Sequence, residues 1–168
     1  RIAHDDFYSL FVVNKMGICD AVQFQYNHWC TRYASVFLSF FIAHLLQFRF
    51  TLFIYQILLL VWFVATVYWS IKNILLPYFS IVNSITSAQI IQISILIVSG
   101  IFYSSFSIGE VWFWLASNST YIVSVLCFAN GCFLLLKTHK SFAHYLLIAV
   151  LFGFVGASNE SLWIFASI

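Results

Sequence analysis

Residues 51–71 read TLFIYQILLLVWFVATVYWSI and contain no charged side chain. A bilayer-spanning α-helix needs about 20 consecutive apolar residues, because each residue rises about 1.5 Å across about 30 Å of hydrocarbon. This stretch therefore predicts a transmembrane helix. In the whole chain of 168 residues, 63% are hydrophobic and 7% are charged, whereas a soluble domain carries about 25% charged residues. With a mean hydropathy of +0.99, the chain is expected to be an integral membrane protein.

Other apolar runs lie on both sides of this stretch. Their number predicts an all-α fold, a polytopic transmembrane helix bundle, with runs at 33–48, 51–71, 87–104, 119–136 and 142–157. The first and the last run are short for a span, and a sixth run begins near Leu162. The stretch KNILLPYFSIVNSIT, residues 72–86, contains the sole proline and is too apolar for a simple loop. We expect a re-entrant or surface helix there.

The first 32 residues are the most polar part of the chain. We expect residues 1–32 to form an outer loop and an amphipathic interfacial helix, and residues 33–168 to form the transmembrane helical region. Asp20 follows Gly17 and is predicted to be the N-cap of the interfacial helix, with Gln23 completing a capping box. Trp and Tyr side chains in this segment favour the interface between membrane and water.

Composition excludes several classes of protein. The net charge is only +2 and no basic stretch exists, so nucleic-acid binding has no support. The four cysteines lack zinc-type spacing and are expected to be buried free thiols. No GxSxG, HExxH, P-loop or GxGxxG motif is present. The chain starts without Met and stops within the apolar segment SLWIFASI, so we expect a piece of a longer protein.

The rare charged residues are the first candidates for chemistry, since a charge at mid-membrane costs about 2.5–3.5 kcal/mol. Asp5 and Asp6 are adjacent. Such a pair can act as a general base, ligate a divalent cation or accept hydrogen bonds from a sugar, or it can simply cap a helix in water. Arg32 ends an aromatic-rich stretch, where its guanidinium can clamp a phosphate or reach up to the lipid headgroups.

Two further acids lie in aromatic or small-residue surroundings. Glu110 stands near Trp114 in GEVWFWLASNSTY, residues 109–121. A carboxylate can hold sugar hydroxyls while aromatic rings stack on the sugar, but an aromatic belt with one solvated acid is the alternative. Glu160, in GASNES, lies between two apolar runs, either at a polar break that faces a cavity or in a plain turn. Asn118-Ser-Thr120 also matches the glycosylation acceptor pattern.

The number of crossings decides which acids share a face of the membrane. If all five runs cross, the Asp5–Asp6 pair and Glu110 fall on opposite faces. If one stretch between 33 and 86 does not cross, all five acids share one face and KTHK, residues 137–140, lies on the other. Because basic loops are enriched on the cytoplasmic side, we favour the second arrangement, with the acids outside.

The order of these motifs resembles the N-terminal part of GT-C class membrane glycosyltransferases, in the bacterial branch that is similar to O-antigen glucosyltransferases. The resemblance rests on DDF at Asp5 and Asp6, on a later stretch with Tyr26, Trp29, Arg32 and Tyr33, on an E-x-x-x-W…Y element at Glu110, Trp114 and Tyr121, and on Asn159 with Glu160. Thr31 departs from the family pattern, which often has Gly before the Arg.

The resemblance implies an enzyme that transfers a sugar from a polyprenyl-phosphate-linked donor to a cell-envelope glycan or lipid acceptor. Its place would be the plasma (inner) membrane, among membrane lipids, with the site on the outer face. Asp5 or Asp6 would be the catalytic base; the resemblance fixes no cofactor, and a divalent cation held by this pair stays open. Donor or acceptor contacts would come from Tyr26, Trp29, Arg32, Glu110, Trp114, Tyr121, Asn159 and Glu160.

Two other functions stay open. A transporter or flippase segment would line a path with Gln89, Gln92, Asn130 and the break near Pro77, although interhelical hydrogen bonds also account for the three amides. A non-catalytic subunit of a membrane complex would scatter its acids without a shared cavity.

Overall fold

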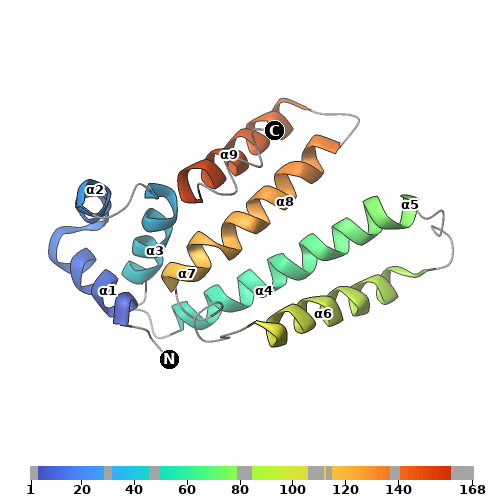
Figure 1. The fold of residues 1–168 in the computed structure, drawn as a ribbon, viewed down its shortest axis with the longest axis horizontal. Coiled ribbons are helices and arrows are strands. Elements are labelled where there is room, and N and C mark those ends of the chain that lie inside the picture. Colours follow the sequence, from blue (N-terminus) through green and yellow to red (C-terminus); the bar gives the residue numbers. More distant parts are fainter. Residues whose placement is uncertain are drawn as a thin grey trace.

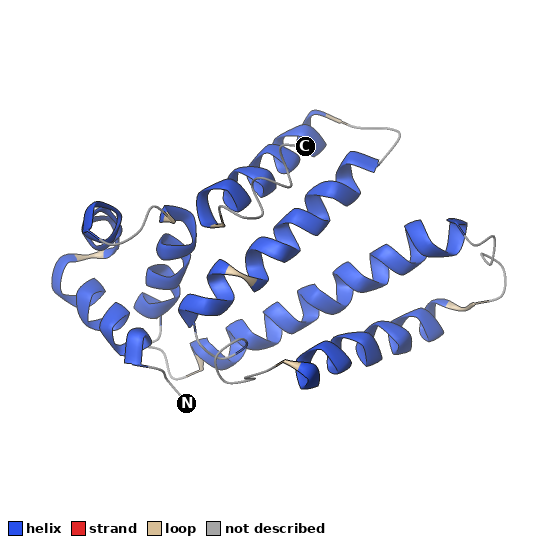
Figure 2. Cartoon of the chain, in the orientation of Figure 1, coloured by secondary structure: helices blue, strands red, loops and turns tan. Residues whose placement is uncertain are grey.

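The computed structural model describes residues 4–28, 32–45, 50–78, 85–105, 112, 115–136 and 141–159. Every secondary-structure element in these ranges is helical, so the predicted all-α class is confirmed (Figure 2). Three helices are long and apolar enough to cross a membrane, and they cover Thr51–Tyr78, Ser87–Ser104 and Ser117–Leu136.

The longest helix contains the uncharged stretch at 51–71. Helix α4 (Thr51–Ser70) continues through the π-helical segment η1 (Ile71–Leu75) into α5 (Leu76–Tyr78). The sequence predicted a re-entrant or surface helix at residues 72–86. This prediction is wrong for residues 72–78, which continue α4, and residues 79–84 lie outside the described part of the chain. In η1 the Leu76 N–H bonds to the carbonyl of Ile71, five residues back. Pro77 has no N–H and its ring crowds the preceding turn, so a widened turn directly before it has a physical cause.

Helix α6 (Ser87–Ser104) begins with a capping box. The Thr86 hydroxyl accepts from the Gln89 N–H at 3.3 Å, and the Gln89 side chain accepts from the Thr86 N–H at 2.8 Å. The Gln89 side chain therefore caps the start of its own helix. The prediction that it forms an interhelical hydrogen bond is wrong. This helix packs along α4.

The C-terminal half forms a helical hairpin. Helix α7 (Leu115–Thr120) leads into α8 (Ile122–Leu136), which packs against α9 (Phe142–Ser158). A Cβ built on Gly131 would lie 3.0 Å from the ring of Phe152, so the two helices approach closely there. The Asn130 amide donates to the Thr66 hydroxyl of α4 at 2.9 Å. The predicted interhelical hydrogen bond of Asn130 is confirmed.

Three shorter helices precede α4: α1 (His4–Met16), α2 (Ile18–His28) and α3 (Tyr33–Leu45). Where the sequence predicted a loop, the chain forms α1. The predicted N-cap at Asp20 is also wrong, because α2 begins at Ile18 and Asp20 lies inside its first turn. Gly17 makes the corner between α1 and α2 with a φ of 82°, a conformation that glycine adopts without strain.

The helices alternate in direction, as Figure 1 shows. Helix α4 runs away from α1, α2 and α3; α6 returns, α8 leaves again and α9 returns. The end of α6, the start of α7 and the end of α9 therefore lie at the same end as α1–α3, which we call the α1–α3 end. The opposite end, called the α5 end, holds Tyr78 and Leu136. Helix α3 has 13 residues, a length of about 20 Å, which is short of the hydrocarbon thickness of about 30 Å.

Candidate functional site

The two adjacent acids lie in the first turn of α1. Asp5 and Asp6 follow His4, where the helix begins, and their side chains lie outside the described part of the chain. Carboxylates in a first turn are stabilised by the unpaired N–H groups and the helix dipole. The position of Asp5 and Asp6 therefore fits stabilisation of the start of α1. Their role as a catalytic base stays a prediction.

Arg32 lies at the start of α3. Its backbone carbonyl accepts from the Ser35 hydroxyl at 3.2 Å and from the Val36 N–H at 3.1 Å, so the residue forms the first turn of the helix. The residue is half-buried. Tyr26 of α2, which is 50% exposed, contacts Tyr33 edge to face with ring centroids 6.4 Å apart. The aromatic stretch predicted around Arg32 thus forms a local cluster on α2 and α3.

The packing of α1 on α3 separates the acid pair from Arg32. Val12 and Val13 of α1 bury against Phe40, near the middle of α3, and the two helices run in roughly opposite directions in Figure 1. The first turn of α1 therefore lies toward the C-terminal end of α3, whereas Arg32 lies at its N-terminal end. At about 1.5 Å per residue, the two positions are about 20 Å apart along the helix axes.

Of the remaining predicted residues, the structure describes Asn159 and Tyr121. Asn159 ends α9, where its N–H bonds to the Val155 carbonyl at 2.9 Å, and Figure 1 shows this end of α9 beside the N-terminal half of α3. Tyr121, 51% exposed, joins α7 to α8. Four predicted residues lie outside the described residues: Trp29, Glu110, Trp114 and Glu160.

A buried polar network where α3, α4 and α7 meet was missed by the sequence interpretation. The Tyr55 hydroxyl donates to Asn118 Oδ1 at 2.9 Å, and Asn118 Nδ2 donates to the Trp112 carbonyl at 3.1 Å. Nearby, Ser39 and Ser119 share a hydrogen bond of 2.6 Å between their hydroxyls. Asn118 is completely buried, so its match to the glycosylation pattern cannot be used in the folded chain. The one signal in the sequence for this network was the Asn118 amide within an apolar stretch.

This network fixes both sides of the segment that carries Glu110. The Trp112 indole N–H donates to the Ser105 hydroxyl at 2.9 Å, which ties the residues on either side of 106–111 together. Trp112 is 2% exposed and packs against Phe102 and Phe63, with ring centroids 5.1 and 5.7 Å apart. Leu115 packs against Ile42 and Ala43, near the C-terminal end of α3. The anchors of this segment therefore lie on the same side as the acid pair.

The three amides that a transporter path would use lie in different surroundings. Gln89 caps a helix start, Gln92 is exposed on α6, and Asn130 lies in α8 against α4. Asn130 lines a hollow between α4, α8 and α9.

The described residues contain no candidate metal site. Within the described ranges, no group of three or more His, Cys, Asp or Glu side chains is placed to hold an ion. Cys19, Cys127 and Cys132 are free thiols, as predicted. Of these three, only Cys127 is buried, because Cys19 is exposed and Cys132 is half-buried, so the predicted burial is wrong for these two.

Comparison of the chain with protein-family models, with curated proteins and with solved structures finds no match.

Proposed function

We propose that the chain belongs to a multi-pass membrane glycosyltransferase of GT-C type, which transfers a sugar from a polyprenyl-phosphate-linked donor to a cell-envelope glycan or lipid acceptor. One observation carries the proposal: the helix ends next to the rare acids lie at the same end of the helices, the α1–α3 end, with the end of α9 beside the N-terminal half of α3 and the others toward its C-terminal end. They are the first turn of α1 with Asp5 and Asp6, the two anchors of the Glu110 segment, and the end of α9 directly before Glu160.

The proposed orientation puts the α1–α3 end outside the cytoplasm, in the plasma (inner) membrane. The described part of α3 is shorter than a membrane span, α4, α6 and α8 are long enough to cross, and α9 returns to the α1–α3 end with 17 residues. This supports a bundle whose short N-terminal helices lie in the outer interface. The sequence has no Asp or Glu from residue 21 to 109 or from 111 to 159, so the connections at the α5 end carry no acid but include Lys137 and Lys140. The short connection at 137–140 supports a cytoplasmic position for this end, because Lys and Arg are enriched in short cytoplasmic loops.

In the proposed reaction, Asp5 or Asp6 takes the proton of the acceptor hydroxyl as its oxygen attacks the anomeric carbon of the donor sugar. The bond from that carbon to the phosphate oxygen breaks, and the electron pair leaves with the polyprenyl phosphate. The base and the phosphate lie on opposite sides of one carbon atom, a separation of a few ångströms. Because Arg32 is about 20 Å from the acid pair, we assign it to a part of the donor or acceptor away from the reacting carbon.

The test is sugar transfer by the full protein in vesicles that contain a polyprenyl-phosphate-linked sugar. The variants are Asp5→Asn, Asp6→Asn and the double variant, with Lys15→Gln, an exposed residue of the same helix, as the matched control. We expect at least one acid variant to lose transfer while its membrane insertion and helix content stay unchanged. Full transfer by the double variant would overturn the proposal.

A further inference from the structure

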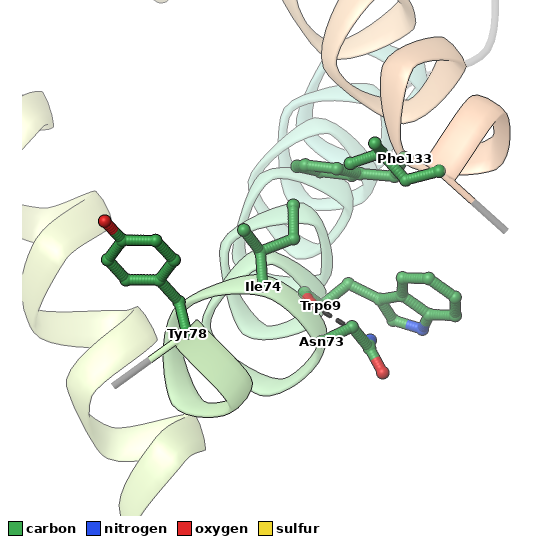
Figure 3. Close-up of a pocket in the computed structure, with 6 residues that line it drawn as sticks. Trp69, Asn73, Ile74, Tyr78 and Phe133 are labelled. Carbon is green, nitrogen blue, oxygen red and sulfur yellow. Dashed lines mark hydrogen bonds between the residues drawn. The ribbon is translucent and has the colours of Figure 1, made fainter. Parts of the chain in front are cut away.

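A groove between α4 and α8 lies at the α5 end, lined by Trp69, Asn73, Ile74, Tyr78, Phe133 and Leu136. Figure 3 shows its Asn73 amide, which donates to the Trp69 carbonyl at 3.0 Å. The other side chains of this lining are apolar or aromatic, so the groove has no group of polar atoms that would select a ligand. Among the described residues, the buried polar atoms without a partner lie away from this groove.

Four buried side-chain atoms of the described residues have no hydrogen-bond partner: Gln25 Oε1, Gln56 Nε2, Ser124 Oγ and Ser158 Oγ. The two serines have no exposed surface at all. A buried hydroxyl without a partner has given up its hydrogen bonds to solvent and gained none in return. Because buried polar groups of native proteins are normally paired, the two serines indicate a partner from outside the chain.

Other hydroxyls in the spanning helices bond to their own helix. Those of Ser94 and Ser70 donate to the carbonyl four residues back at 2.7 Å, and that of Thr66 does so at 2.9 Å. This is the usual way in which a helix satisfies a hydroxyl in apolar surroundings. Ser124 and Ser158 also lie in α-helices but make no such bond, so their hydroxyls are turned away from their own backbone carbonyls.

The two serines lie at the same level of the α8–α9 hairpin. Helices α8 and α9 run side by side in opposite directions (Figure 1). Cys127 of α8 and Val155 of α9 belong to one cluster of buried residues. Ser124 lies three residues before Cys127, and Ser158 lies three residues after Val155. Because three residues are nearly one helical turn, both steps lead to the same level and stay on the facing sides of the two helices.

This level is close to the α1–α3 end. Ser124 is the third residue of α8, and Ser158 is the last residue of α9. A small polar ligand can therefore enter from that end without crossing the hydrocarbon layer. The ligand must be small, since the two helices approach closely further along, at Gly131. A water molecule has this size, and it can donate to one hydroxyl and accept from the other.

We propose that Ser124 and Ser158 bind one water molecule between α8 and α9, which donates a hydrogen bond to one hydroxyl and accepts one from the other. This bridge would hold the last turn of α9 to the first turn of α8. The proposal rests on the burial and the register of these two side chains. It does not depend on the proposed function.

The first test detects the water by solid-state NMR, on the full chain in vesicles of deuterated phosphatidylcholine. We expect magnetisation from water protons to reach the backbone amides of Ser124 and Ser158 at a mixing time that gives no signal at Ser94. Ser94 is the matched control because it is also completely buried, but its hydroxyl is satisfied by the Ile90 carbonyl. In the double variant Ser124→Ala/Ser158→Ala, the signal at both positions should fall severalfold.

The second test is the equilibrium constant of unfolding in mixed detergent micelles. Ser124→Ala and Ser158→Ala should each raise this constant about tenfold, because each removes one side of the bridge and leaves the other hydroxyl without its partner. The double variant should cost little more than either single variant, since the bridge is already lost after the first substitution. Ser94→Ala removes a hydrogen bond within one helix and should have a smaller effect than either.

Three outcomes would overturn the proposal. If either alanine variant is more stable than the unmodified chain, that hydroxyl has no partner to lose. If the costs of the two single variants simply add, the two serines do not share a ligand. If water magnetisation reaches neither serine amide, or reaches both equally well in the double variant, the hydroxyls do not hold a water.

Discussion

The hydroxyl of Tyr55 in α4 donates a hydrogen bond to the side-chain carbonyl of Asn118 in α7, at 2.9 Å. The same amide donates to the Trp112 carbonyl at 3.1 Å. The Asn118 side chain therefore joins α4 to the segment before α7. Because Asn118 has no exposed surface, each of these hydrogen bonds is protected from competition with water and lipid.

This relationship predicts that Asn118→Ala destabilises the protein. The substitution leaves the Tyr55 hydroxyl and the Trp112 carbonyl without their partner, at a cost of about 1–3 kcal/mol. Tyr55→Phe removes one hydrogen bond only and should cost less. The measurement is the free energy of unfolding in mixed detergent micelles, with the exposed Asn27→Ala of α2 as the control. Equal stability of Asn118→Ala and Asn27→Ala would contradict the hydrogen-bond network.

The close approach of α8 and α9 gives a second prediction, on a matched pair of glycines. A side chain at Gly131 meets the Phe152 ring at 3.0 Å, whereas a Cβ at Gly153 has no neighbour within 4 Å. Gly131→Val should therefore cost about 1–3 kcal/mol of unfolding free energy through overpacking. Gly153→Val introduces the same side chain into the same hairpin and should cost much less. The idea fails if the two variants unfold at the same detergent composition.

The separation of Asp5 and Asp6 from Arg32 predicts different kinetic effects. Loss of a general base should lower kcat by about 10²–10⁴-fold, so the acid variants should act on kcat. Arg32→Ala should instead raise KM and leave kcat nearly unchanged, because the proposal assigns Arg32 to a contact away from the reacting carbon. The measurement is steady-state transfer at varied donor and acceptor concentrations. A kcat loss in Arg32→Ala as large as that of the acid variants would require Arg32 at the reacting centre.

The proposed orientation predicts which thiols a membrane-impermeant maleimide reaches. Cys19 is exposed at the α1–α3 end, and Ser141, exposed before α9, lies at the α5 end. With the other cysteines changed to Ser, Cys19 should be labelled in intact cells. A Ser141→Cys variant should be labelled only after the membrane is opened. Labelling of both thiols in intact cells, or the reverse order, would refute the orientation.

Much of the helical fold follows from the sequence because lipid requires it. A chain in hydrocarbon must satisfy its backbone hydrogen bonds internally, so the uncharged runs predict helices. The run at 51–71 became α4, and the run at 87–104 became α6 almost residue for residue. The hydrogen bond of Asn130 could also be predicted, since polar residues inside a span join helices.

Predictions from single residues were wrong where a neighbouring residue determined the start of the helix. Asp20 looks like an N-cap, but Gly17 makes the corner and α2 starts before the acid. Gln89 looks like an interhelical amide, but Thr86, three residues earlier, engages it in a capping box. The hydrogen bond from Tyr55 to Asn118 joins residues 63 positions apart. No periodicity in the sequence indicates which buried amide accepts a hydrogen bond from which hydroxyl.

The unbroken helix from Thr51 to Tyr78 has a consequence for membrane thickness. Its 28 residues measure about 42 Å, about 12 Å more than the hydrocarbon layer. The first charged residue along it is Lys72, so the excess length lies between Lys72 and Tyr78, in the π-helical η1 and in α5. In a bilayer of changing thickness, this end would slide through the headgroup layer, while the start of α4, beside α3, keeps its depth.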